Sequence, residues 1–108
     1  MNWLHLLSYF FGGAFLANAV PHFISGTQGR AFQTPFAKPS GIGLSSSVVN
    51  VWWGAFNAGV GYLLLCRVGN FEFRSTADVL ACGVGLLVLS LFSAQHFGQF
   101  HGGKQTER

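Results

Sequence analysis

Residues 48–66 read VVNVWWGAFNAGVGYLLLC, and this stretch decides the class of fold. It contains no acidic or basic residue. As an α-helix it would be about 28 Å long, at about 1.5 Å per residue, which is close to the hydrocarbon thickness of a bilayer. Ser45, Ser46 and Ser47 precede the stretch and can cap the start of a helix, and Arg67 ends it. The sequence therefore predicts a transmembrane helix over residues 48–66.

Two further apolar runs have the same character, at residues 3–20 and 77–97. Pro21 closes the run 3–20. Ser75 and Asp78, at the start of the run 77–97, form a pair that is typical of a helix N-terminus. A cleaved signal peptide is an alternative for the first run, but no Lys or Arg precedes it, so a retained helix is favoured. We predict an all-α membrane protein, a bundle of about three transmembrane helices forming a single domain over residues 1–108.

The composition agrees with a membrane location. Of the 108 residues, 50% are hydrophobic and 8% are charged, whereas a soluble domain carries about 25% charged residues. The basic residues stand singly between and after the apolar runs, without the patch that nucleic-acid binding requires. The lipid bilayer is the expected partner, and no nucleic acid is expected.

A long connection, residues 21–47, separates the first two predicted spans. It holds all three prolines together with Phe23, Phe32 and Phe36. Aromatic residues are frequent at the membrane–water interface, so we predict an interfacial loop, with a re-entrant loop as the alternative. Residues 98–108, which begin and continue with glycines, are predicted to form a short polar tail.

Three crossings would place this connection and the C-terminus on the same side of the membrane. That side would hold four basic residues (Arg30, Lys38, Lys104 and Arg108) against two on the other side (Arg67 and Arg74). The positive-inside rule then places the N-terminus outside and the C-terminus in the cytoplasm.

Small and polar residues share one narrow arc of the second predicted helix, at about 100° per residue. In a bilayer, close packing of small residues and interhelical hydrogen bonds hold helices together, so this seam requires a partner surface. The third run offers one at four-residue spacing. We predict packing between these two helices; the alternative is a polar path for an uncharged solute lined by Asn50 and Asn57. The seam residues are Ser47, Asn50, Gly54, Asn57 and Gly61, facing Ala77, Ala81 and Gly85.

Three histidines fall at one predicted membrane face, His22 at the end of the first helix and His96 and His101 at the end of the third. Neutral imidazoles are common ligands of zinc, copper and haem iron. The sequence spacing matches no standard site, and interfacial roles are the alternative. A metal or haem cofactor is therefore a hypothesis, and none is favoured.

The chain lacks the residue sets on which catalysis usually depends. It has no intramembrane pair of carboxylates, no nucleophile–base–acid set and no phosphate-binding glycine loop. We therefore predict a non-enzymatic membrane component that packs through its second and third helices, as a homo-oligomer or as an accessory subunit of a larger membrane complex.

Three segments in the first half of the chain carry a resemblance: residues 18–23 (NAVPHF), 35–46 (PFAKPSGIGLSS) and 49–54 (VNVWWG). Together they resemble a group of short bacterial membrane proteins. This resemblance implies a bacterial inner-membrane location. It implies no particular chemistry, and it assigns no functional residue.

Overall fold

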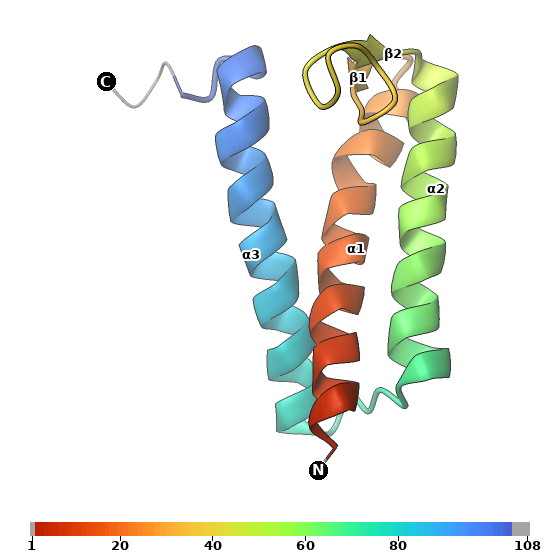
Figure 1. Ribbon diagram of the computed structural model, residues 1–108, viewed down its shortest axis with the longest axis vertical. Coiled ribbons are helices and arrows are strands. Elements are labelled where there is room, and N and C mark those ends of the chain that lie inside the picture. Colours follow the sequence, from red (N-terminus) through yellow and green to blue (C-terminus); the bar gives the residue numbers. More distant parts are fainter. Residues whose placement is uncertain (1, 105–108) are drawn as a thin grey trace.

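The protein is a bundle of three long helices in the computed structural model, which describes residues 2–104. Helix α1 spans Trp3–Thr27, α2 spans Ser47–Leu63 and continues into a π-helical turn, η1, at Leu64–Val68, and α3 spans Thr76–His101 (Figure 1). All three segments are long and apolar enough to cross a membrane. The prediction of a helical protein with three potential spans is confirmed at this level.

Helix α1 lies at the centre, and the other two helices pack on it rather than on each other. Of the most apolar stretch of each helix, 33% is buried in α1 and 28% in α2, against 6% in α3. The predicted packing of the second helix on the third is therefore not found as an extensive contact within one chain over residues 2–104. The small faces of both helices are turned to α1 instead, because the 3.6-residue period fixes a face but not its neighbour.

The predicted helix starts are capped as the sequence indicated. Oγ of Ser46 accepts a hydrogen bond from the backbone N–H of Val49, and Oγ of Ser75 accepts one from the N–H of Asp78. These caps satisfy backbone donors that have no partner within the helix.

Two helix ends differ from the prediction. Helix α1 does not stop at residue 20 but continues through Pro21 to Thr27. A proline inside a helix removes one backbone hydrogen bond, and the turns beyond it pack on α2, where Phe23 lies against Gly54 and Gly26 against Val51. Helix α3 continues to His101 and ends at Gly102, whose φ of 86° is accessible to glycine. The predicted tail thus begins after residue 101, and residues 105–108 lie outside the described chain.

The predicted loop 21–47 is not confirmed in that form. Its first seven residues are helical, and the remaining connection forms a small antiparallel hairpin of β1 (Phe32–Gln33) and β2 (Leu44–Ser45). Phe32 pairs with Ser45 in this hairpin, and the Phe32 and Gln33 side chains are buried. The hairpin folds over one end of the bundle, which we call the hairpin end (Figure 1).

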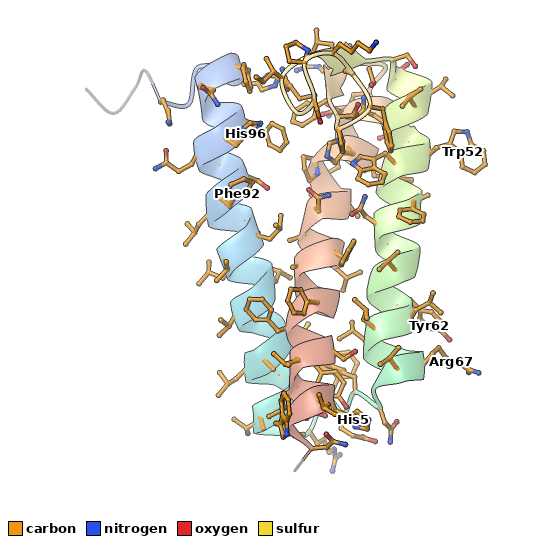
Figure 2. All side chains as sticks on the ribbon, viewed as in Figure 1. His5, Trp52, Tyr62, Arg67, Phe92 and His96 are labelled. Carbon is orange, nitrogen blue, oxygen red and sulfur yellow. The ribbon has the colours of Figure 1, made fainter. Side chains whose placement is uncertain are left out.

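At the opposite end, α1 fixes the start of the α2–α3 connection. The Ser8 hydroxyl donates a hydrogen bond to the carbonyl of Leu64 in the π-helical turn. Oη of Tyr9 accepts a hydrogen bond of 2.9 Å from the backbone N–H of Asn70. Figure 2 places His5 at this end and His96 near the other.

Candidate functional site: the wedge between the first and third helices

The contact between α1 and α2 contains a polar pair near the middle of α2. Nδ2 of Asn18 on α1 donates a 3.0 Å hydrogen bond to Oδ1 of Asn57 on α2. Nδ2 of Asn57 in turn donates to the backbone carbonyl of Trp53 at 2.8 Å. The side chain of Asn57 is 1% exposed, so its amide is satisfied within the protein, as a polar group in hydrocarbon requires.

A second polar pair lies nearer the hairpin end. His22 and Asn50 are both buried, and Nδ1 of His22 lies 2.8 Å from Oδ1 of Asn50. Nδ2 of Asn50 lies within hydrogen-bond distance of the carbonyls of Phe32, Ser45 and Ser46. Because these carbonyls only accept, they fix the orientation of the amide, and Nδ1 of His22 must donate. Asn50 therefore connects α1, α2 and the hairpin.

The glycines of the predicted seam also face α1. A methyl group on Gly54 would meet the Cβ atom and the backbone of Phe23, and one on Gly61 would meet the side chain of Leu16. Ser47 lies beside Gly26 of α1. With Asn50 and Asn57 held by α1 and the hairpin, the five seam residues form the α1–α2 contact. This arrangement gives no support to a polar path along Asn50 and Asn57 within one protomer.

The predicted small face of α3 meets α1 at a close helix crossing. A methyl group on Gly85 would lie 1.9 Å from the carbonyl oxygen of Phe10, and one on Gly13 would lie 2.1 Å from that of Cys82. Ala81 faces the first turns of α1, and Ala77 is half-buried at the start of α3. Gly13 was missing from the prediction. It follows Gly12, which faces α2. The adjacent glycines Gly12 and Gly13 thus allow the close approach of α2 and of α3 to α1.

The two histidines of α3 attach this helix to the hairpin. Nε2 of His96 donates to the carbonyl of Gly41 at 2.7 Å, and Nε2 of His101 donates to Oε1 of Gln33 at 2.8 Å. The ring of His101 also stacks on Phe32, with centroids 4.9 Å apart and planes inclined by 12°.

All three predicted histidines lie toward the hairpin end, but the structure gives each of them a separate oxygen partner. Among residues 2–104, no three His, Cys, Asp or Glu side chains form a group that could hold a metal ion. The three-histidine metal site proposed from the sequence is therefore not assembled, because His22 is buried toward α2 whereas His96 and His101 reach the hairpin from α3.

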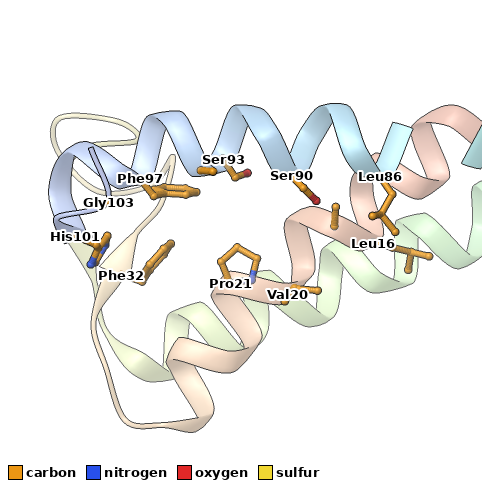
Figure 3. A pocket seen from close by; sticks show the side chains of 13 residues that line it. Leu16, Val20, Pro21, Phe32, Leu86, Ser90, Ser93, Phe97, His101 and Gly103 are labelled. Carbon is orange, nitrogen blue, oxygen red and sulfur yellow. The ribbon is translucent and has the colours of Figure 1, made fainter. Parts of the chain in front are cut away.

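Helices α1 and α3 diverge from their crossing toward the hairpin end, as Figure 1 shows. The divergence leaves a wedge-shaped cleft of about 660 Å³ that opens outward from the bundle. We call it the wedge (Figure 3). Its α1 wall is formed by Leu16, Ala17, Val20 and Pro21. Its α3 wall is formed by Leu86, Ser90, Ser93 and Ala94, and its hairpin end is closed by Phe32, Phe97, Gly98, His101 and Gly103.

Polar groups of the wedge stand in otherwise apolar walls. Ser90 and Ser93 lie one helical turn apart on the α3 wall, and neither hydroxyl has a hydrogen-bond partner among the described residues. On the α1 wall, Pro21 has no N–H, so the carbonyl of Ala17 cannot accept the regular helical bond from that residue. No Asp, Glu, Lys or Arg of residues 2–104 lines the wedge.

The prediction from the sequence did not include the wedge. In the sequence, only Ser90 and Ser93 indicate a polar face on this part of α3, because two hydroxyls three residues apart in an apolar helix lie on the same face. The divergence that turns that face into a cleft is a tertiary feature. Comparisons with family models, curated proteins and solved structures give no match, so the geometry of the chain carries the functional argument.

Proposed function

We propose that this chain is a non-enzymatic component of the bacterial inner membrane that holds a lipophilic molecule in the wedge between α1 and α3. The observation that carries the proposal is the wedge itself. Its volume of about 660 Å³ falls within the range of about 300–1,000 Å³ typical of small-molecule sites. Its walls are mostly apolar, and it opens sideways, where a molecule dissolved in the bilayer can enter.

A lipophilic occupant suits these walls better than an aqueous solute does. Leu16, Val20 and Leu86 offer apolar surface, and the rings at the hairpin end close the cleft toward the membrane surface. Filling the cleft would give both helices van der Waals contacts that a void cannot supply. The lining offers no nucleophile–base pair, which supports a binding role rather than a catalytic one.

Native mass spectrometry of protein gently extracted from its own membrane tests this proposal. We expect one lipophilic molecule bound per chain. Ala94 is an exposed residue of the α3 wall, so Ala94→Phe should fill the wedge and remove the bound mass without unfolding the protein. Leu91→Phe, on the exposed surface of α3 outside the wedge, is the matched control and should retain the ligand. A native protein without bound mass would contradict the proposal.

The exposure of α3 favours a second candidate function, as a homo-oligomer or an accessory subunit of a membrane complex. Only 6% of the apolar stretch of α3 is buried, and α1 is its one extensive helix contact among the described residues. Crosslinking in native membranes, followed by mass determination, tests this candidate. A crosslinked species containing α3 peptides would support it, and protein that stays monomeric at every crosslinker dose would contradict it.

We propose that the N-terminus lies outside and the hairpin end lies in the cytoplasm. Arg30, Lys38 and Lys104 belong to the hairpin end, whereas Arg67 and Arg74 belong to the opposite end, which agrees with the positive-inside rule. Labelling of intact cells with an impermeant maleimide tests the orientation. In a Cys66→Ser, Cys82→Ser background, Asn70→Cys should be labelled from outside, and Ser40→Cys should react only after lysis.

A further inference from the structure

The hydroxyls of Ser90 and Ser93 lie deep in the membrane-spanning part of α3. Ser93 is eight residues and Ser90 eleven residues before His101, the last residue of the helix. At about 1.5 Å per residue, they lie about 12 and 16 Å below that end of a helix that is about 39 Å long. The ester and phosphate oxygens of a phospholipid stay near the head-group level, so they do not reach this depth.

The hydroxyls of Ser90 and Ser93 are available to a molecule in the wedge, since Ser90 is exposed and Ser93 is half-buried. Neither makes a side-chain hydrogen bond among the described residues, so each can donate to an acceptor that enters the cleft. Figure 3 shows both side chains on the inner side of α3, toward the α1 wall. A molecule that occupies the wedge and carries oxygen acceptors at this depth would satisfy both hydroxyls.

The charge of the lining indicates a neutral molecule. No Asp, Glu, Lys or Arg of residues 2–104 lines the wedge, and Nε2 of His101 is already bonded to Gln33, so an ion would enter without a fixed counter-charge. The groups on the α3 wall that can donate are hydroxyls, which match carbonyl oxygens on the ligand.

The shape of the hairpin end suits a flat ring. Phe32 and Phe97 lie with ring centroids 4.8 Å apart, and Phe32 stacks on His101. Aromatic faces pack favourably against other planar π-systems. Below them, Ala17 and Ala94 contribute short side chains to the two walls, which leaves space between the helices.

From these observations we infer that the wedge binds the carbonyl-bearing ring of a long-chain quinone. The hydroxyls of Ser90 and Ser93 donate hydrogen bonds to the ring oxygens, and the apolar tail leaves through the lateral opening into the bilayer. The inference covers binding and includes no electron transfer. It rests on the proposed function, because a wedge that holds no lipophilic molecule holds no quinone.

Photolabelling with an azido-decylquinone, followed by peptide mapping, tests the inference on the full chain in nanodiscs. We expect labelled residues on both walls of the wedge, and unlabelled decylubiquinone should compete. The Ser90→Ala, Ser93→Ala double variant should label about tenfold less at low probe concentration, which corresponds to about 1.4 kcal/mol of binding free energy lost with the two hydrogen bonds. Ser25→Ala, a serine of α1 outside the wedge, is the control and should label normally.

A photoactivatable phosphatidylglycerol in parallel samples separates the two proposals. If this lipid labels the wedge and the quinone does not, the quinone inference is overturned and the proposed function stands. If neither probe labels the wedge, the quinone inference is overturned, and the native mass measurement decides the proposed function separately. Equal quinone labelling of the native protein and of the double-serine variant overturns the assignment of the hydroxyls, and equal labelling of Ala94→Phe overturns the assignment of the wedge.

Discussion

His22 and Asn50 join the first helix to the second through a buried hydrogen bond of 2.8 Å between Nδ1 and Oδ1. The same Asn50 amide binds carbonyls of the hairpin, which makes this pair the meeting point of three segments. A hydrogen bond of this kind replaces apolar burial as the means of fixing helix positions in a bilayer.

Replacing Asn50 by Leu should destabilise the protein by about 2 kcal/mol, because His22 and the hairpin carbonyls would be left without partners. Denaturant unfolding in mixed micelles, followed by circular dichroism, measures the loss. Val48→Leu, at a residue that is 64% exposed, should change the stability little. Equal stabilities of the two variants would contradict the role of the buried pair.

Gly85→Ala should loosen the crossing of α1 and α3, since the added methyl group would lie 1.9 Å from the carbonyl oxygen of Phe10. We expect a loss of about 1–3 kcal/mol, the range for overpacking of a close contact. Gly83 lies on the same helix with open space at its Cβ position, so Gly83→Ala is the control. A larger effect at Gly83 than at Gly85 would show that the crossing is misplaced.

Gly54→Ala should lower the thermal midpoint, because its methyl group would lie 2.8 Å from the Cβ atom of Phe23. Gly59, also on α2, has open space around it and should tolerate the same change. Since the neighbours of Gly54 belong to its own chain, neither variant should change the mass measured by light scattering in detergent. A shift of oligomeric mass at Gly54 alone would place this part of the seam between chains.

His96→Leu should release the hairpin from α3, since the bond to the carbonyl of Gly41 is lost. Hydrogen–deuterium exchange should rise around residues 34–43, because local opening governs exchange of exposed backbone amides. His5→Leu, at the opposite end of the bundle, is the control and should leave this region unchanged. Unchanged exchange in both variants would mean that the hairpin is held by its α1 and α2 contacts alone.

Much of the α2 contact surface could be predicted from the sequence. Asn50 and Asn57 lie on one arc with three small residues, and amide side chains in hydrocarbon must find partners. Their actual partners could not be predicted in the same way. His22 was expected at the end of α1, whereas the helix continues past Pro21 and places its ring one turn inside, opposite Asn50. The sequence shows that Pro21 removes one backbone hydrogen bond from the helix. It does not show the packing of the following residues on α2, which offsets that loss.

By itself, the sequence determined the three apolar helices, their caps and the faces on which small and polar residues gather, because hydrophobic period and capping chemistry are properties of each helix alone. The tertiary structure alone decided that α1 lies in the centre, that Asn50 and Asn57 meet α1, and that α3 diverges beyond its crossing to leave the wedge. The helical period determines the direction in which each side chain projects from its own helix. Which neighbour it meets depends on close approaches such as Gly85 to Phe10, and these exist only when the helices are packed together.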